Sequence, residues 1–324
     1  MSESGVPPER MKFDTMLVDG YSVGFRTGFA FSLTGEGDRP TQVTFGMLKF
    51  LNAFLERYEP KTCCICWDFK GSEVKKNLFP AYKANREKPD PLTEKDIEQV
   101  RIVAEIKKQI EDFVLIAPMF GLKSVRMEGV EADDIIGILC ERLQNTLVIS
   151  YDRDLLQVVN LGAKVYYLPK DMLVDLGNFE SIFGVPPELF VDYKAILGDP
   201  GDNIDGLRGF GEVTSKKLVN RHGPWRDWFV GDRVKATVLN DLNKSQKVII
   251  ADRTSQMKLD RNNSLIKLGH LLDDATKTKL WSDFEGQKPN VDQAEVRKFL
   301  LSNSMVEFLA GFNNWLHPFK MLME

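Results

Sequence analysis

Cysteine and histidine are scarce in this sequence of 324 residues, which contains four cysteines and three histidines. Three of the cysteines, at positions 63, 64 and 66, lie inside one apolar run. Adjacent side chains of a strand point to opposite faces, and few histidines are available to complete a metal site there. We therefore interpret these cysteines as reduced residues that pack a buried strand, and not as metal ligands.

Long apolar segments are also missing. No run approaches the roughly 18–20 residues that a membrane span requires, and the polar stretch of residues 1–12 lacks the apolar core of a signal peptide. We therefore expect a cytoplasmic protein that makes no membrane contact. The net charge of −4 gives no sign of a nucleic-acid partner, but a total charge says nothing about how the charges are distributed along the chain.

Strand-like and helix-like segments alternate in the first half of the chain. We predict strands at three short apolar runs, residues 15–18, 62–67 and 146–150, and helices at residues 41–58 and 93–113. This alternation favours an α/β fold with a mostly parallel sheet. An aspartate follows each strand: Asp19, Asp68 and Asp152. Because the carboxyl ends of parallel strands share one edge, we expect these three side chains to converge.

More carboxylates cluster where a helix is expected to begin. Glu131, Asp133 and Asp134 directly precede an apolar run, and Asp154 follows Asp152. An acidic first turn is by itself typical of many helices, because the helix dipole stabilises negative charge there. Five converging carboxylates, however, repel one another unless cations are present. Hard oxygen ligands at this density suit Mg²⁺ or Mn²⁺, which predicts a metal centre.

Basic residues concentrate between the second strand and the helix at 93–113. Residues 61–95 contain five acidic residues and two interspersed aromatic residues, Phe79 and Tyr82. They also contain eight basic residues: Lys61, Lys70, Lys75, Lys76, Lys83, Arg86, Lys88 and Lys95. A solvated charged loop would explain such a run. Aromatic residues interleaved with lysine and arginine are equally typical of surfaces that bind single-stranded nucleic acid.

A second glycine-rich region follows. Asp199 and Asp202 lie in a Gly/Pro turn, and the segment 206–218 then combines a glycine-rich turn with a helix start. This arrangement resembles a helix-hairpin-helix, whose backbone N–H groups hold a DNA phosphate. A dinucleotide-binding loop would instead require a preceding strand. Residues 225–324 are expected to be mostly helical, with helical runs at 294–301 and 304–316.

Six segments, taken in order, resemble the structure-specific 5′ nucleases, a family of phage 5′–3′ exonucleases, nuclease domains of bacterial DNA polymerase I and flap endonucleases. They are Leu17–Gly20, Trp67–Asp68, Tyr82–Arg86, Val130–Asp134, Ser150–Asp154 and Gly198–Asn203. The resemblance implies an α/β nuclease domain over residues 1–200, with a central mostly parallel sheet flanked by helices. It also implies a helical arch at about 70–95 over the active site. Residues 201–324 would form a mostly helical DNA-binding region, with the helix-hairpin-helix at about 204–222.

The same resemblance implies which side chains form the site. Nine carboxylates would bind two Mg²⁺ ions directly or through water, with Mn²⁺ as a substitute: Asp19, Asp68, Glu131, Asp133, Asp134, Asp152, Asp154, Asp199 and Asp202. Lys83 and Arg86 on the arch would contact the scissile phosphate as catalytic residues, and Tyr82 would stack on a base. The duplex would be held at Gly209, Gly211, Lys216 and Lys217, where a K⁺ ion is a further expectation.

The implied substrates are DNA molecules with a 5′ flap, a nick or a free 5′ end, and an RNA–DNA hybrid is an open alternative. The protein would act as a monomer in replication, in the host cytoplasm if it is phage-encoded, with a single-strand-binding protein as a candidate partner. Three residues depart from the family pattern. Tyr151 stands where glycine is usual, and Arg208 and Phe210 stand where small residues are common in the glycine-rich turn.

The predicted chemistry is hydrolysis of a phosphodiester bond assisted by two divalent ions. Two other functions compete with it. An aspartyl-phosphatase also carries Asp-x-Asp after a strand, but it would leave the basic segment unexplained. A non-catalytic DNA-binding protein would have no use for nine clustered acids, which repel DNA.

Overall fold

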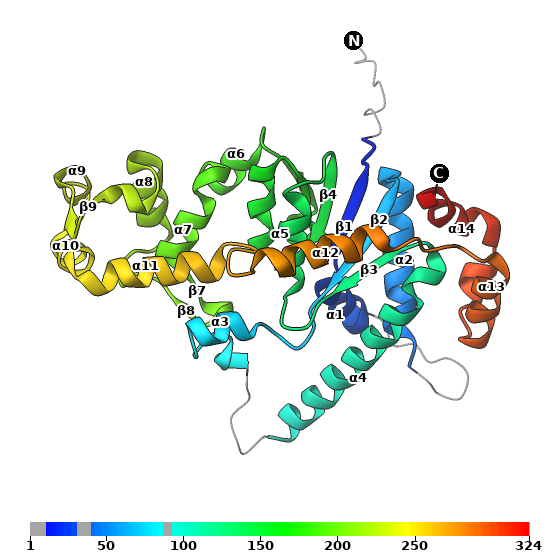
Figure 1. Ribbon diagram of the computed structural model, residues 1–324. Helices are drawn as coiled ribbons and strands as arrows, with labels where there is room; N and C mark the ends of the chain where they lie inside the picture. Colours follow the sequence, from blue (N-terminus) through cyan, green and yellow to red (C-terminus); the bar gives the residue numbers. More distant parts are fainter. Residues whose placement is uncertain (1–10, 31–39, 87–92, 324) are drawn as a thin grey trace, which may run out of the picture.

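The computed structural model describes residues 11–30, 40–86 and 93–323 (Figure 1). Most of the polar N-terminal stretch and residues 87–92 of the predicted arch therefore lie outside the described residues. A six-stranded sheet in the order β3-β2-β1-β4-β5-β6 forms the centre. Its strands are β1 Thr15–Asp19, β2 Thr62–Trp67, β3 Lys123–Arg126, β4 Thr146–Ser150, β5 Lys164–Tyr167 and β6 Met172–Val174. The first five are parallel and β6 runs antiparallel to β5, which confirms the predicted α/β class.

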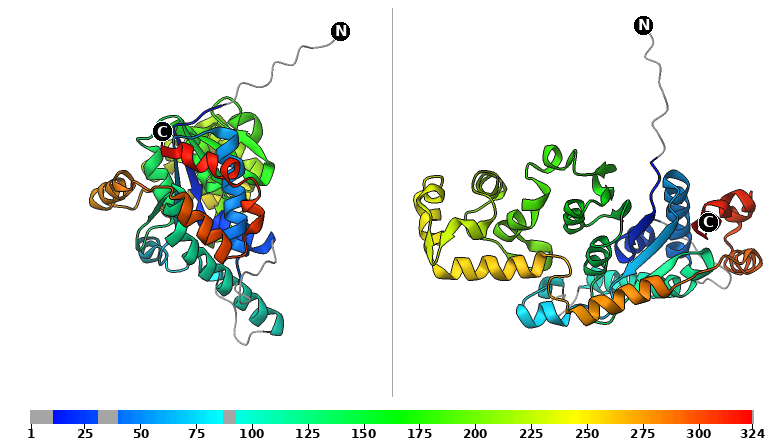
Figure 2. Two further views of the ribbon diagram at one scale, coloured as in Figure 1. Left: turned by 90° about the vertical axis from the view of Figure 1, so that its right-hand side faces the viewer. Right: turned by 45° about the horizontal axis from the view of Figure 1, so that its top comes forward.

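Helices cover both faces of the sheet (Figures 1 and 2). Met16 and Val18 of β1 point into one core, and Leu17 points into the other. The first core is closed by α1 Gly20–Ala30, α2 Gln42–Tyr58, α4 Glu94–Ile116, α13 Gln293–Ser302 and α14 Phe312–Lys320. The second is closed by α5 Ala132–Cys140, α6 Phe179–Phe183, α7 Phe190–Leu197, α8 Glu212–His222, α11 Arg253–Ile266 and α12 Asp274–Gly286. The strands are buried on both faces, which explains why they read as continuous apolar runs.

The cysteines of β2 behave as predicted. Cys63, Cys64 and Cys66 are free and buried, with Cys63 in one core and the other two in the opposite core. Cys140 is likewise free and buried. Burial raises the pKa of the Cys140 thiol to about 12, so this residue serves as an apolar packing group.

The C-terminal residues differ in detail from the expectation. The predicted helical run at 304–316 is wrong, because the chain is interrupted at Ser304 and at Gly311, both of which have positive φ angles. A short 3-10 helix at Val306–Leu309 precedes α14. The helices α12, α13 and α14 return to the N-terminal part, where they pack near β3, the 3-10 helix Ala117–Phe120 and α2. No described helix is long and apolar enough to cross a bilayer.

The remaining elements lie at the opposite end of the molecule from α13 and α14 (Figures 1 and 2). This end holds α8, α11, α9 Ala236–Leu239, α10 Lys244–Ala251 and the short hairpin of β9 Phe229–Val230 and β10 Arg233–Val234. Between it and the sheet lie α7 and a second hairpin, β7 Gly198–Asp199 with β8 Ile204–Asp205. The second hairpin carries Asp199 and Asp202 back toward the carboxyl edge of the sheet.

Candidate active site

The carboxyl edge of the central strands forms the floor of the site. Asp19 ends β1, and Asp68 and Asp152 follow the neighbouring strands β2 and β4, as predicted. The Asp19 carboxylate accepts hydrogen bonds from the Ser22 backbone N–H at 3.1 Å and from the Ser150 hydroxyl at 2.9 Å. These two donors fix the side chain at the centre of the edge, between its two aspartate neighbours.

The acidic start of α5 lies beside this floor. Asp68 accepts a hydrogen bond from the Ala132 backbone N–H at 2.8 Å, which joins the end of β2 to the first turn of the helix. Glu131 occupies the N-cap position, and Asp133 and Asp134 lie in the first turn. Asp134 is buried and accepts a hydrogen bond from the Gly269 N–H at 2.8 Å. The helix start therefore places its carboxylates against the strand-end aspartates.

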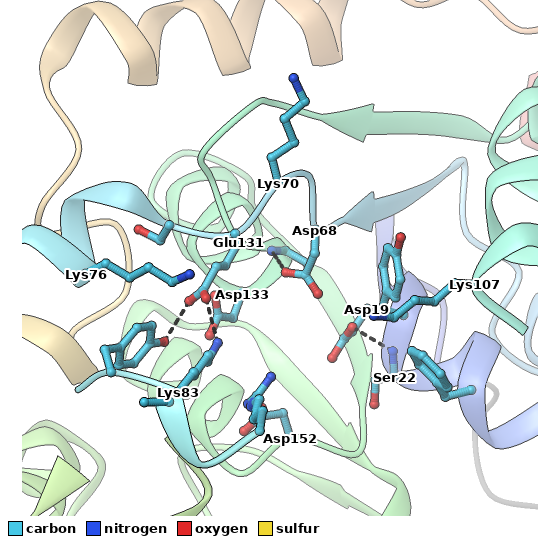
Figure 3. Close-up of a pocket in the computed structure, with 18 of the residues that line it drawn as sticks. Asp19, Ser22, Asp68, Lys70, Lys76, Lys83, Lys107, Glu131, Asp133 and Asp152 are labelled. Carbon is cyan, nitrogen blue, oxygen red and sulfur yellow. Dashed lines mark hydrogen bonds and ion pairs between the residues drawn. The ribbon is translucent and has the colours of Figure 1, made fainter. Parts of the chain in front are cut away.

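A cavity of about 840 Å³ opens above these carboxylates (Figure 3). Acidic residues line its floor, and basic residues of the 70–86 segment line one side, where Lys76 and Lys83 lie beside Glu131. Ser22 and Lys107 lie on the opposite side, near Asp19. The cavity thus brings together residues from β1, β2, β4, α5, α1, α4 and the basic segment.

Four of the nine predicted carboxylates have no ion-pair partner among the described residues. We call Asp19, Asp68, Asp133 and Asp152 the unpaired carboxylates. Burial and the nearby charges of Asp68 and Asp152 raise the pKa of Asp19 to about 8. Burial also raises the pKa of Asp68 to about 6, and desolvation together with Asp133 raises that of Asp152. Such shifts mean that the charged forms are destabilised here in the absence of cations.

The other carboxylates are neutralised by side chains of the protein itself. We call Glu131, Asp134, Asp154, Asp199 and Asp202 the paired carboxylates. The buried Lys75 ammonium lies 2.8 Å from both Glu131 and Asp134. Burial alone would lower the pKa of Lys75, but Asp133, Asp134 and Glu131 raise it well above its ordinary value. Oxygens of Glu131, Asp133 and Asp134 gather within 4.8 Å, as in a metal site, yet Lys75 already occupies two of them.

Lys83 and Arg86 provide further pairing from the basic segment. The Lys83 ammonium lies 2.6 Å from Glu131 and 3.7 Å from Asp202, and Arg86 lies 2.6 Å from Asp202. Burial would raise the pKa of Glu131, but Lys75 and Lys83 outweigh it and lower this pKa to about 2. Lys83 has a φ angle of +57°, in the left-handed region that lysine rarely adopts. Its backbone N–H donates to the Asp202 carbonyl at 2.9 Å, which holds that conformation.

Lys194 neutralises the remaining pair. Its buried ammonium donates to Asp154 and lies 2.7 Å from Asp199. Burial would lower the pKa of Lys194, but these two carboxylates raise it above its ordinary value. Sequence reasoning missed this residue, although a lysine inside the apolar run of α7 was a usable signal, since buried lysines are almost always paired. Lys75 was recognised only as one member of a basic run.

The predicted arch is described in part. It includes α3 Glu73–Leu78, a 3-10 turn at Ala84–Arg86 and the start of α4, whereas residues 87–92, with Lys88, lie outside the described residues. Tyr82 is only 3% exposed, and its hydroxyl donates to Glu131 at 2.9 Å and to Asp202 at 3.0 Å. The base-stacking role predicted for Tyr82 would require this side chain to leave both partners.

The glycine-rich turn adopts the geometry expected before a helix. Gly209 has a φ angle of +78°, and no atom lies within 4 Å of where a side chain would start at Gly209 or at Gly211. Gly211 is the N-cap of α8, so the first N–H groups of this helix are open to a ligand. Phe210 is 2% exposed and packs in the second core, which explains its departure from a small residue. Arg208 is exposed.

The two lysines of α8 are also paired. Lys216 lies 2.7 Å from Glu212, and Lys217 lies 3.0 Å from Asp241. The Lys216 and Lys217 side chains are themselves 26% and 51% exposed, although the Asp241 side chain is only 9% exposed. An ion pair made by an exposed lysine contributes little stability and exchanges readily for another anion. The lysines therefore remain able to contact a phosphate.

Residues 14–184 match a family described as 5′-3′ exonuclease, N-terminal resolvase-like domain. The chain belongs to this family. A 5′-3′ exonuclease of Bacillus subtilis is 30% identical over 262 residues, which cover 76% of this chain and 80% of that protein. DNA polymerase I of Caldicellulosiruptor bescii is 30% identical over 266 residues. The chain spans only about 30% of that polymerase's length.

Solved structures with the same fold extend the comparison beyond residue 184. The T5 5′-exonuclease, in a structure with bound zinc ions, has a TM-score of 0.67 at 21% identity and covers 84% of this chain and 98% of its own. The flap endonuclease-1 of Methanococcus jannaschii has a TM-score of 0.57 at 13% identity and covers 96% and 93%. These likenesses confirm the predicted fold of this 5′-3′ exonuclease family member.

Proposed function

We propose that this chain is a divalent-metal-dependent 5′ nuclease that hydrolyses phosphodiester bonds of DNA at a 5′ flap, a nick or a free 5′ end. The observation that carries the proposal is the set of unpaired carboxylates beneath a cavity bordered by basic residues. Clustered acids alone would repel a phosphodiester. Beside bound cations and the basic segment, the same acids form a site that attracts one.

The unpaired carboxylates fit a divalent cation. Asp19, Asp68, Asp133 and Asp152 offer only oxygen atoms, which suits Mg²⁺ with Mn²⁺ as a substitute. The raised pKa values of Asp19, Asp68 and Asp152 indicate that positive charge is in short supply beside these three carboxylates. A divalent cation held there would stabilise negative charge on the reacting phosphate and lower the pKa of a bound water.

A two-ion mechanism also requires the paired carboxylates. Asp154 and Asp199 share the Lys194 ammonium, and Asp202 is shared by Lys83 and Arg86. A second ion bound by these three carboxylates would therefore have to share their oxygens with the lysine and arginine side chains that already neutralise them. Glu131 and Asp134 are held in the same way by Lys75, so they orient the first turn of α5 and tune its charge.

Lys83 and Arg86 are the proposed contacts to the scissile phosphate. Both approach the carboxylates from the basic segment, and Lys83 lines the cavity in an unusual backbone conformation. Residues held in such conformations cluster at functional sites. A lysine that moves from Glu131 to a phosphate would exchange one anion for another as the substrate enters.

The glycine-rich turn is the proposed duplex contact. Gly209 and Gly211 leave the N-terminus of α8 open, and Lys216 and Lys217 lie within its first two turns. A K⁺ ion there, an RNA–DNA hybrid substrate, a single-strand-binding partner and a monomeric state are finer parts of the proposal. The division of the chain into residues 1–200 and 201–324 is also part of the proposal. The two parts contact each other, because α12, α13 and α14 pack against elements of the first part.

One experiment tests the function directly. A 5′-labelled flap, a nicked duplex and an RNA-primed duplex are incubated with the protein side by side, in Mg²⁺ and in excess chelator. We expect cleavage near the 5′ end or junction in Mg²⁺ alone. Acid-stable phosphate on an aspartate would instead indicate an aspartyl-phosphatase, and metal-independent binding without cleavage would indicate a DNA-binding protein.

A further inference from the structure

The aromatic side chains that line the cavity differ in how firmly contacts within the protein hold them. Four line it: Tyr21, Phe25, Tyr82 and Tyr151. Tyr82 is buried and bonded to two carboxylates. The Tyr21 hydroxyl donates to Glu111 at 3.0 Å, and its ring lies edge-on to Trp67. Both of these rings are therefore fixed parts of the wall.

The Tyr151 side chain is held by fewer contacts than those of Tyr21 and Tyr82. Its side chain is half-buried, and its hydroxyl makes no hydrogen bond within the described part of the chain. Its position, however, is well defined. The Tyr151 backbone N–H donates to the Ser22 hydroxyl at 3.3 Å, and the next residue along the chain is the unpaired carboxylate Asp152. The ring thus lies directly beside the floor of the site, on a backbone held to α1.

A guanidinium group covers this ring. The Arg26 guanidinium carbon lies 5.4 Å from the centre of the Tyr151 ring. Arg26 is exposed and forms no ion pair with a described carboxylate, unlike Lys75, Lys83, Arg86 and Lys194. An arginine over an aromatic face is held by the ring and still presents its N–H groups to an anion. Lys107 of α4, also exposed and without a described ion-pair partner, lines the same cavity.

These groups match the chemistry of a nucleotide. A nucleobase has an aromatic face that stacks on a tyrosine ring, and its neighbouring phosphates suit guanidinium and ammonium groups. We propose that Tyr151, supported by Arg26, is a substrate-positioning residue that stacks on the base of a nucleotide adjacent to the scissile phosphodiester. Through this contact the phosphate is held over the unpaired carboxylates from the side of the cavity opposite Lys83.

The proposal rests on the proposed nuclease function and assigns a role to one residue of that site. It differs from a packing role for Tyr151 in a measurable way. A packing residue would affect cleavage of all substrates alike. A stacking residue would affect cleavage only where a base is present to stack on it.

The test combines protein variants with substrates that lack one base. A single abasic residue is moved through each position on either side of the cut, and kcat/KM is measured for each substrate. At one position the unaltered protein should lose roughly 5- to 150-fold, the equivalent of one base–aromatic stack of about 1–3 kcal/mol. In Tyr151→Leu this position-specific loss should disappear, because the base no longer has a ring to contact.

Matched variants make the result specific. Tyr151→Phe should keep the abasic penalty, because the hydroxyl has no partner to lose. Phe29→Leu removes an exposed aromatic ring of α1 that lies outside the cavity and stacks on the cavity-lining Phe25, and it should keep the abasic penalty because Tyr151 is retained. Arg26→Ala should reduce the penalty in part, and it provides a second arm if Tyr151→Leu is poorly folded. Equal abasic profiles in the unaltered protein, Tyr151→Leu and Arg26→Ala would overturn the proposal, whereas absence of cleavage by the unaltered protein would overturn the nuclease function itself.

Discussion

The nine predicted carboxylates, five of which line the cavity, form two groups that differ in how their charge is balanced. The paired carboxylates are neutralised by three lysines and an arginine of the same chain. The unpaired group lines the cavity, where Asp19 and Asp68 accept hydrogen bonds from N–H and hydroxyl groups, but it forms no ion pair with a side chain in the described part of the chain. Paired carboxylates are part of the folded framework, whereas unpaired ones are positioned for a ligand that brings positive charge.

The two groups should therefore respond in opposite ways when a charge is removed. Breaking a buried ion pair leaves the remaining charge without compensation, which destabilises the fold. Removing an unpaired acid from a repulsive cluster relieves that repulsion instead.

Asp152→Asn should abolish cleavage in Mg²⁺ while leaving the fold intact. The variant removes a charge from the unpaired group, so the melting temperature of the metal-free protein should stay equal or rise. Asp134→Asn should also abolish cleavage, but it should lower the melting temperature because Lys75 loses a buried partner. Calorimetry of both variants in chelator, beside the cleavage assay, checks this contrast. Near-normal turnover by Asp152→Asn would show that the metal centre lies elsewhere.

Lys75→Met should destabilise the protein by about 3–5 kcal/mol, the usual cost of leaving a buried charge unpaired. Both Glu131 and Asp134 would lose their common partner. Urea unfolding in chelator measures the change in the free energy of unfolding. The neighbouring Lys76→Ala is the control, because Lys76 is exposed and should change stability by no more than about 0.5 kcal/mol. Added Mg²⁺ should restore part of the loss in Lys75→Met if the freed oxygens accept the ion.

This division shows what the sequence could and could not reveal. Three strand-end aspartates and an acidic helix start predicted the carboxylate edge, because parallel strands bring such residues together whatever the details of packing. The two buried lysines that pair with four of these carboxylates, Lys75 and Lys194, were not predicted as their partners. Lys194 lies five residues before Asp199 but 40 residues after Asp154, and Lys75 reaches Glu131 across 56 residues. Only the tertiary fold establishes such contacts.

The burial of Tyr82 was also not foreseen, because it too depends on contacts made by the tertiary fold. Its place in a basic, aromatic segment suggested a surface that meets nucleic acid, because exposure cannot be read from local composition. Its burial depends on the neighbouring hairpin of β7 and β8, whose turn brings Asp202 to the Tyr82 hydroxyl. Gly198 permits that hairpin, since a side chain there would start 2.4 Å from the Ile204 carbonyl oxygen.

Lys83→Ala tests a lysine that pairs with Glu131 in this structure and that we propose contacts the scissile phosphate. If Lys83 leaves Glu131 for the scissile phosphate, its charge acts mainly in the transition state, and kcat should fall by about 100-fold. DNA affinity should change much less, because other contacts share it. Single-turnover cleavage and binding titrations in Ca²⁺ separate the two quantities. Weaker binding with normal turnover at saturation would assign Lys83 to docking alone.

Lys216 and Lys217 lie at the other end of the molecule, and their loss should weaken duplex binding only modestly. Each lost phosphate contact on duplex DNA should lower the slope of log affinity against log salt by about 0.9. Replacing Lys216 and Lys217 together by alanine should therefore flatten the slope on plain duplex by up to about 1.8. Binding of a free single strand should stay nearly unchanged, because we propose that the basic segment at about 70–95, and not the glycine-rich turn, holds the single-stranded 5′ end.

The carboxylate that pairs with Lys217 supplies the control for that measurement. Asp241→Asn removes a carboxylate that contacts Lys217 and Arg221, so the duplex slope should stay equal or steepen while the lysines are retained. Salt titrations of the double-alanine variant, Asp241→Asn and the unaltered protein, on duplex and on single-stranded DNA, form one comparison. Equal losses of the double-alanine variant on both substrates would mean that the glycine-rich turn is not a separate duplex contact, and its interpretation as a helix-hairpin-helix would then be abandoned.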